Sequence, residues 1–492
     1  MDNSVFFISD SGNTYLYDFK YKMYLCVHPL IEEFYELDKK NVEVEHWKEN
    51  ISNNLCDSDD EFNHQIDKYF YLKKNGFFTQ EKQNITKYNS DESTIRYNLS
   101  HINHIVFEVT DKCNLNCFYC AFGELYGNYD RRHTKMMSKE DAMAFVNFFV
   151  DLWKTSQYSN IQQNVTISFY GGEPLLNFGL IDFLVKYISN VFPQNIHPIF
   201  SMTTNGMLLG KYIDFLVKHK FHILVSLDGD KPSNSYRKQF DGGESYDKIY
   251  TQLLDIQKSY PYFFKNNINF NSVLHNRNSV KSINDYFSDN FNKRSNISEL
   301  NPVGLSPAKV KEFNDIFKEK DDVFDPSKLA NIIRSSITRK VATFLRQYSR
   351  NYYDDILNLY IDRDTTVWPC TGTCSPFSKK IFLTVNGKIL PCERIGHNYP
   401  LGNLNNGIIK LDPKTISELY ASVYDRINKQ CKKCYMIRSC KMCIFCMENL
   451  SNLSCDNYGT KEVFKKYISS NVSLLEDKRN IYNIIISNIL IH

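Results

Sequence analysis

The cysteines of this chain gather in two places, and their distribution constrains the fold more than any other feature of the sequence. Of 14 cysteines, nine lie between Cys370 and Cys455, and three form a tight group at Cys113, Cys117 and Cys120. The N-terminus lacks the basic and apolar segments of a signal peptide, so a secreted disulfide framework is not expected. In a reducing compartment, clustered thiols bind metal more often than they pair. We therefore expect a cytoplasmic, metal-binding protein.

The composition excludes other classes of protein. The 492 residues carry a formal net charge of +3 and are 42% hydrophobic. This length predicts two or three domains, and the nearly balanced charge argues against nucleic-acid binding. The most apolar late stretch, residues 481–491, is interrupted by polar side chains and is shorter than the roughly 20 residues of a membrane helix. We expect neither nucleic acid nor membrane among the partners.

Strand and helix patterns alternate regularly between residues 101 and 306. Strands are predicted at residues 104–110, 164–170, 198–205, 221–229, 267–276 and 297–304, and the helices between them at 138–156, 178–192, 209–219, 245–259 and 279–291. This alternation indicates parallel β/α units with a sheet buried on both faces. Six units are too few for an eight-fold barrel, so the predicted fold class is α/β with a partial (β/α)6 TIM-type barrel.

The flanking regions have different patterns. Residues 1–95 begin with alternating apolar positions, which indicate a hairpin-rich sheet, and continue with helical patterns at about 29–36 and 60–75. Residues 81–100 are polar and are predicted to be a linker. Residues 307–365 are predicted as a helical connector, 366–458 as a cysteine-rich domain and 459–492 as a C-terminal helix.

The first cysteine group follows the first predicted barrel strand with the spacing Cys113-x3-Cys117-x2-Cys120. Three thiolates can hold three irons of a 4Fe–4S cluster and leave the fourth iron open to a small ligand. The same residues could instead form a zinc site that lacks one ligand, or a loop with unrelated thiols.

This motif resembles the signature of the radical S-adenosylmethionine (radical SAM) superfamily, whose cluster binds S-adenosylmethionine (AdoMet). The resemblance extends to "YGGEP" at residues 170–174 and "SLDGD" at residues 226–230. It implies an AdoMet site built from Tyr119 at the adenine, the GGE residues at the amino group, Ser226 at the ribose and Arg237 at the carboxylate. The GGE residues are Gly171, Gly172 and Glu173. Taken alone, the glycine pair could be only a tight turn and Arg237 a solvated surface charge.

The second cysteine group contains a strong hairpin signal at Asn386-Gly387, which places Cys374 and Cys392 on or beside two strands. Zinc ribbons would explain such thiols. Together with the first group, however, the region resembles the SPASM domain, which carries two auxiliary 4Fe–4S clusters. The resemblance implies two ligand sets, namely Cys370, Cys374, Cys392 and Cys443 in one, and Cys431, Cys434, Cys440 and Cys455 in the other.

The cysteine spacing departs from the SPASM pattern near its end. Cys440-x2-Cys443-x2-Cys446 offers two candidates for one ligand, and the nine thiols exceed the eight that two clusters need. Glu393 follows Cys392 directly, and a related maturase group has an acidic residue there as proton acceptor. A surface Glu393 paired with Arg394 is the alternative.

SPASM proteins mostly modify peptides, and residues 1–95 resemble in pattern the winged-helix-like (RRE-like) module that binds the leader of a precursor peptide. A cap over the barrel mouth is the alternative. The predicted function is a radical SAM peptide maturase that uses AdoMet, three 4Fe–4S clusters and an external electron donor such as flavodoxin or ferredoxin. It would form a thioether, carbon–carbon or carbon–oxygen cross-link in a ribosomal precursor peptide. The alternatives are a sulfatase-type maturase that makes formylglycine and a non-catalytic iron–sulfur or zinc protein that binds a partner.

Overall fold

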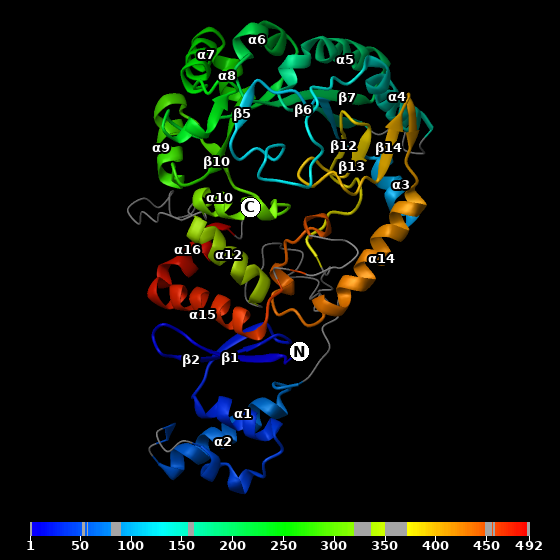
Figure 1. Cartoon of the computed structure of the whole chain (residues 1–492). Coiled ribbons are helices and arrows are strands. Elements are labelled where there is room, and N and C mark those ends of the chain that lie inside the picture. The colour runs from blue at the N-terminus through cyan, green and yellow to red at the C-terminus, as the bar shows by residue number, and fades with distance from the viewer. Residues whose placement is uncertain are drawn as a thin grey trace.

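The computed structural model describes residues 2–51, 55–56, 58–79, 90–155, 162–318, 336–349, 371–447, 455 and 458–489. Its centre is a ten-stranded sheet, in which seven neighbouring strands are parallel, six of them from the region of alternating strands and helices (Figure 1). In spatial order these six are β11 (Ser295–Glu299), β10 (Ile268–Leu274), β8 (His222–Ser226), β7 (Ile196–Thr204), β6 (Gln163–Gly171) and β4 (His104–Thr110). The predicted α/β alternation and the mostly parallel sheet are confirmed.

Helices alternate with these strands along the chain, and five of them lie close to the predicted ranges. They are α4 (Lys139–Thr155), α5 (Phe178–Val191), α6 (Leu209–Lys218), α7 (Tyr246–Ser259) and α9 (Val280–Phe291), while the short helix α8 (Pro261–Asn267) follows α7 without having been predicted. The backbone N–H of Asp141 donates to Ser138 Oγ at 3.0 Å, as the predicted cap requires. The last parallel strand, β11, begins two residues earlier than predicted and ends at Glu299.

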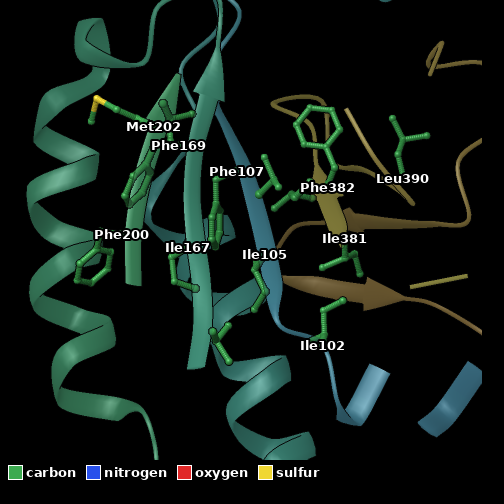
Figure 2. Close-up of a cluster of buried hydrophobic side chains, with 14 of the residues drawn as sticks. Ile102, Ile105, Phe107, Ile167, Phe169, Phe200, Met202, Ile381, Phe382 and Leu390 are labelled. Carbon is green, nitrogen blue, oxygen red and sulfur yellow. The ribbon is translucent and has the colours of Figure 1, made fainter. Parts of the chain in front are cut away.

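The two faces of the parallel strands differ in polarity because successive side chains point to opposite faces. One face carries buried apolar side chains such as Phe107, Phe169 and Phe200, which pack as a continuous row (Figure 2). The other face is partly polar, since Ser168 Oγ lies 2.6 Å from His104 Nε2 and 2.5 Å from Ser201 Oγ. The barrel interior therefore carries polar side chains, while the helix-covered face supplies the core.

The cysteine-rich region does not form a sheet of its own. The predicted hairpin is present as β12 (Ile381–Leu383) and β13 (Lys388–Leu390), and β12 pairs in parallel with β4. Two further strands, β14 (Gly402–Asn405) and β15 (Ile408–Lys410), complete the ten-stranded sheet. Figure 2 shows Ile381 beside Ile105, its register partner, so the hairpin satisfies the free edge of β4 and extends its apolar face.

The N-terminal region forms a three-stranded antiparallel sheet of β1 (Ser4–Ile8), β2 (Thr14–Asp18) and β3 (Met23–Cys26). The two predicted helices are present as α1 (Leu30–Lys39) and α2 (Asp59–Lys74), and they cover one face of the sheet.

The other face packs on one helix of the connector and on two helices near the end of the chain (Figure 1). These are α12 (Ser336–Tyr348), α15 (Lys461–Asp477) and α16 (Arg479–Ile489). Tyr17 lies 5.7 Å from Phe464 between ring centroids, in a core that both termini share. Residues 1–95 therefore have one core of their own, between the sheet and its two helices, and share a second core with the later helices.

Three helices of the described residues, α3, α8 and α14, were not predicted. The expected linker contains α3 (Glu92–Ser100), whose first turn is capped by the Asp91 carboxylate, while residues 81–89 lie outside the described residues. The cysteine-rich region contains α14 (Pro413–Cys431), capped by Asp412, and α3 packs against it. A shorter helix, α10 (Val310–Ile316), begins the connector. Among the described residues, no helix is both long and apolar enough to cross a membrane.

Candidate functional site

The first cysteine group lies where parallel strands of the barrel end, the usual place for a ligand site in such sheets. Cys113 follows β4 after two residues. Cys117 belongs to β5 (Leu115–Cys117), which pairs antiparallel with β9 (Arg237–Gln239), the strand that carries Arg237. The loop is thus fixed at both sides, by the barrel and by this small second sheet.

Hydrogen-bond donors from three segments point at the sulfurs of this loop. Arg132 Nη2 lies 3.0 Å from Cys120 Sγ, Asn205 Nδ2 lies 3.7 Å from Cys113 Sγ, and the Leu115 N–H donates to Cys113 Sγ at 3.4 Å. Burial raises the pKa of Cys117 to about 12 despite the opposing Arg237 charge, so its thiolate needs a bound cation in place of the proton. Hydrogen bonds to the ligand sulfurs tune the reduction potential of iron–sulfur clusters. Three cysteine sulfurs are also soft ligands of the kind that these clusters take.

The glycines of the GGE motif allow a close approach of two backbone segments. A Cβ at Gly171, whose φ is +141°, would lie 2.1 Å from the Thr110 carbonyl oxygen, and one at Gly172 would lie 2.2 Å from that of Lys112. The tight contact explains both glycines even without a ligand, so their predicted role at the AdoMet amino group stays a prediction.

Glu173 has a structural contact that its motif did not predict. Its carboxylate is fully buried and accepts hydrogen bonds from Thr204 Oγ1 and from the backbone N–H of Asn205, each at 2.8 Å. Burial raises its pKa to about 7, although these donors oppose the shift. Because Asn205 also donates to Cys113 Sγ, Glu173 connects the end of β7 to the cysteine loop.

Asp228 is the main residue that sequence reasoning missed. Its carboxylate accepts two hydrogen bonds from Arg237, from Nε and Nη2 at 2.9 Å each, and one from the Tyr119 hydroxyl. The backbone N–H of Val273 is a further donor at 2.9 Å. Burial alone would raise the pKa of Asp228, but the Arg237 guanidinium and these donors hold it at about 2. The available sequence signal was the position of Asp228 itself, within "SLDGD" and close in the sequence to Arg237.

Two of the predicted AdoMet residues, Arg237 and Tyr119, belong to this network. Arg237 is buried rather than a solvated surface charge, and its guanidinium lies 5.4 Å from the centroid of the Tyr119 ring. Ser226 ends β8, in register with Asn271 of β10. Asp228 thus fixes the orientation of the two residues predicted at opposite ends of AdoMet.

The later cysteines fall into two sets. Cys443 and Cys446 are in hydrogen-bond contact, and both lie within electrostatic reach of Cys392. The segment before Cys374 runs beside them, because the Gly372 N–H donates to the Met442 carbonyl at 3.0 Å and the Ile444 N–H to Thr373 Oγ1 at 2.8 Å. Cys370 lies outside the described residues.

The other set consists of Cys431, Cys434 and Cys440, whose thiols lie near one another. The Gly459 N–H donates to Cys434 Sγ at 3.3 Å, and the Tyr458 N–H donates to the Cys455 carbonyl, so the chain after Cys455 returns to this set. Within the described ranges, no three His, Cys, Asp or Glu side chains converge as the ligands of a single metal ion would. The thiolates of a four-iron cluster bind different irons, so they need not converge in that way.

Tyr129 lies between the two cysteine groups. Its pKa is raised by burial and by the nearby thiols of Cys446, Cys392 and Cys120, and its hydroxyl lies 3.4 Å from the Arg394 carbonyl oxygen. The first cysteine loop and the Cys392 set therefore face the same space.

Glu393 is not the surface residue of the alternative reading. Its carboxylate is mostly buried and pairs with Lys380, whose Nζ lies 2.9 Å from Oε1, rather than with Arg394. Burial opposes ionisation, but Lys380 keeps the pKa of Glu393 below its usual value. The pair also faces His104 in the barrel interior, whose pKa is lowered to about 4 by burial and by the Lys380 charge.

Comparisons with known proteins agree with this geometry. Residues 107–270 match the family described as "Radical SAM superfamily". The chain is 26% identical over 442 residues to the radical SAM cyclopropyl synthase TigE of Paramaledivibacter caminithermalis, covering 86% of this chain and 84% of that protein. It is 25% identical over 395 residues to a cysteine-type anaerobic sulfatase-maturating enzyme of Clostridium novyi, covering 77% and 97%.

The fold is similar to that of native anSMEcpe with bound AdoMet, with a TM-score of 0.50 and 19% identity over 77% of this chain and 98% of that one. The chain therefore contains a radical SAM domain and is a radical SAM enzyme. Domains of this family bind AdoMet and a 4Fe–4S cluster.

Proposed function

We propose that this enzyme is a peptide maturase, which installs a thioether, carbon–carbon or carbon–oxygen cross-link in a ribosomally made precursor peptide. The observation that carries the proposal is the position of Tyr129 between Cys120 and the set formed by Cys392, Cys443 and Cys446. Cleavage of AdoMet needs only the first cysteine group. A second thiol-rich site that faces the same space as the first cysteine loop is suited to accept the electron that a substrate radical releases.

The residues of the first group would hold the cluster through Cys113, Cys117 and Cys120. When bound, the reduced cluster and AdoMet supply methionine and a 5′-deoxyadenosyl radical, which is the cofactor's own chemistry. Tyr119 would pack on the adenine, and Ser226 would contact the ribose. Arg237 has donors left on Nη1 for the carboxylate, because Asp228 occupies only Nε and Nη2.

The glycine-rich segment would complete the AdoMet site. Gly171, Gly172 and Glu173 bring backbone groups to the position proposed for the amino group. Their fixed geometry comes from the contacts with Thr110 and from the buried Glu173 carboxylate. A rigid site of this kind needs little reorganisation when its ligand binds.

Two auxiliary 4Fe–4S clusters are proposed for the region 366–458. One would use Cys370, Cys374 and Cys392 together with Cys443 or Cys446, and the other would use Cys431, Cys434, Cys440 and Cys455. The backbone contacts between residues 372–373 and 442–444, and those between 455–459 and 434–435, support this division. Four thiolates per set match the ligand number of a closed cluster.

Glu393 is proposed as the acceptor of the proton that leaves the substrate. Lys380 keeps its carboxylate anionic, and an anionic carboxylate in a mostly buried position is suited to act as a base. Residues 1–95 are proposed to bind the leader, since β3 is an edge strand to which an extended peptide can add.

Anaerobic reconstitution tests the proposal directly. The reconstituted chain should contain about 11 to 12 irons, as three four-iron clusters require. It should form 5′-deoxyadenosine from AdoMet with dithionite, and it should remove hydrogens from the precursor peptide encoded beside its gene, as mass spectrometry would detect. Formation of 5′-deoxyadenosine without any change in peptide mass would contradict the cross-linking role.

A sulfatase-type maturase is the second candidate, because the relative from Clostridium novyi carries that name and the chain covers 97% of it. Such an enzyme would convert a cysteine or serine of a sulfatase peptide to formylglycine without a leader. Deleting residues 1–95 cannot separate the two candidates, since it would expose the core that Tyr17 shares with Phe464. Offering the intact enzyme a leaderless sulfatase peptide and the full precursor in parallel separates them.

A further inference from the structure

We propose that Arg132 is the counter-charge of the first cluster and makes that cluster easier to reduce, as AdoMet cleavage requires. The proposal rests on the part of the proposed function that gives a 4Fe–4S cluster to Cys113, Cys117 and Cys120. The step concerned is the uptake of one electron from a one-electron donor such as dithionite. The donor is oxidised, the cluster is reduced, and no bond or proton moves.

Arg132 brings a positive charge to the sulfurs of the first cysteine loop. Its Nη2 lies 3.0 Å from Cys120 Sγ, and all three thiols of the loop lie within electrostatic reach of the guanidinium. Among the described residues, Asn205 is the other side chain that donates to these sulfurs, and it is neutral. A guanidinium stays protonated in proteins. The charge of Arg132 is therefore a fixed property of this loop.

No carboxylate in the described ranges forms an ion pair with Arg132. Glu108 lies within electrostatic reach, but its carboxylate accepts the Val385 N–H at 2.9 Å. Asp111 accepts the His133 N–H at 2.8 Å. Within the same ranges, Arg132 Nε is buried and has no hydrogen-bond partner. Because a partly buried charge without a partner is costly, this guanidinium is suited to an anion that binds beside it.

The second arginine beside the loop shows the contrast. Arg237 lies opposite Cys117, but it is paired with Asp228 through two contacts of 2.9 Å. That pair has no net charge, whereas Arg132 keeps its own. A cluster on three thiolates is anionic, and its reduction adds one further negative charge. The unpaired positive charge beside Cys120 therefore stabilises the reduced form more than the oxidised form.

Contacts with the hairpin of the cysteine-rich region hold Arg132 in place. Its guanidinium lies 5.0 Å from the centroid of the Phe122 ring, and that ring lies 5.8 Å from the His397 ring between centroids. Two residues before Arg132, the Asp130 carboxylate accepts a hydrogen bond from Lys388 Nζ at 2.6 Å. A donor that is already held in position needs little reorganisation when its partner binds.

The test measures the reduction potential of the first cluster in the wild type and in three variants of the full chain. Arg132→Met removes the charge, and Arg132→Lys keeps it. Arg131→Met is the matched control, because it removes an exposed arginine from the neighbouring position. Each chain is reconstituted anaerobically and titrated with dithionite. The first cluster is identified as the electron paramagnetic resonance signal that changes when AdoMet is added.

We expect Arg132→Met to lower the potential by about 60 mV, which is a tenfold smaller equilibrium constant for the uptake of one electron. A change of about tenfold is the usual contribution of one hydrogen bond to a charged group. Arg132→Lys should stay closer to the wild type than Arg132→Met, and Arg131→Met should have the wild-type potential. A merely structural role would not depend on the charge in this way.

An unchanged potential in Arg132→Met overturns the proposal, and so does an equal shift in Arg131→Met. Equal shifts in the two Arg132 variants overturn the role of the charge. Loss of the first cluster from both Arg132 variants, measured as iron per chain, would make the residue a structural part of the loop and also overturns the proposal. Loss from Arg132→Met alone supports the need for a positive charge. A weaker affinity for AdoMet at an unchanged potential would assign Arg132 to AdoMet instead.

The wild type separates this proposal from the proposed function. If its reconstituted chain shows no signal that responds to AdoMet, the proposed function fails and the role of Arg132 fails with it. If the wild type shows that signal and Arg132→Met keeps the same potential, the role of Arg132 alone fails.

Discussion

The two cysteine groups are assembled in opposite ways. The first takes Cys113, Cys117 and Cys120 from one short loop, which β4 and the β5–β9 pair hold at its two ends. The second draws Cys392 and Cys443 from segments that only the tertiary structure brings together. A local loop forms its site wherever the flanking strands form, whereas the later sites depend on the hairpin, α14 and the returning chain at Gly459 all being in place.

This difference in assembly assigns different functions to the two groups, which the sequence alone could not do. AdoMet cleavage should depend on the local group, and completion of the peptide product should depend on the assembled one. Five experiments test that division, in order of decreasing effect.

The largest effect is expected for Cys117→Ala. Loss of one of three thiolates should remove about four irons per chain and abolish 5′-deoxyadenosine formation. Iron analysis and dithionite-driven turnover measure both. Cys26→Ala is the matched control, since Cys26 is exposed on β3 and far from the loop in sequence. Retained turnover in Cys117→Ala would falsify the assignment of the first cluster.

Cys434→Ala should separate AdoMet cleavage from modification of the peptide. The variant should keep dithionite-driven 5′-deoxyadenosine formation, because the barrel and the first loop are untouched. The modified peptide should fall to the detection limit, since one auxiliary cluster is lost. Mass spectrometry of the peptide and iron analysis check this, and equal loss of both activities would show that the two groups are not separable.

Glu393→Gln should lower the rate of peptide modification about 100-fold, the usual contribution of a positioned base. AdoMet cleavage should continue, because Glu393 lies with Lys380 beside the hairpin rather than in the first loop. Glu393→Asp keeps a carboxylate and should recover part of the product rate. A product rate in Glu393→Gln equal to that of wild type would exclude this residue as the base.

Asp228→Asn should destabilise the barrel by about 3–5 kcal/mol, because it leaves the buried Arg237 charge without its partner. Thermal unfolding of the cluster-free chain measures the loss, and equilibrium binding measures a weaker affinity for AdoMet. Ser272→Ala is the control, since Ser272 Oγ donates to the Leu227 carbonyl at 2.6 Å in the same region without carrying a charge. Equal losses in the two variants would contradict a special role for the ion pair.

Glu108→Gln should change how stability depends on pH. Burial raises the pKa of Glu108 to about 7, and its carboxylate accepts the Val385 N–H at 2.9 Å, so it joins β4 to the hairpin. The folded chain keeps this proton between about pH 4 and pH 7, while the unfolded chain loses it near pH 4. Wild type should therefore lose up to about 3 kcal/mol of stability as the pH rises through that window.

The glutamine variant should lack this slope. Urea unfolding of the cluster-free chain at pH 5 and pH 7.5 compares the two proteins. Glu124→Gln, at a site where the carboxylate side chain is 89% exposed, should keep the wild-type slope. A wild-type slope in Glu108→Gln would show that another group is responsible.

Much of the fold could be predicted, because it is encoded locally. The strand pattern around Phe107 and Phe169 gave the parallel sheet, and Asn386-Gly387 gave the β12–β13 hairpin. The helix α14 was not predicted, although its amphipathic pattern begins at the Asp412 cap and ends at Cys431. The pairing of β12 with β4 could not be predicted, because nothing in either strand specifies a partner so far away in the sequence.

The sequence by itself determined the radical SAM motif, since three thiols at fixed spacing after a strand need only that strand to be placed. The tertiary structure alone decided that Asp228 binds Arg237 and Tyr119, that Glu393 pairs with Lys380, and that both termini share one core. The physical reason is that spacing along the chain fixes local geometry, whereas burial and charge pairing depend on neighbours that meet only after folding.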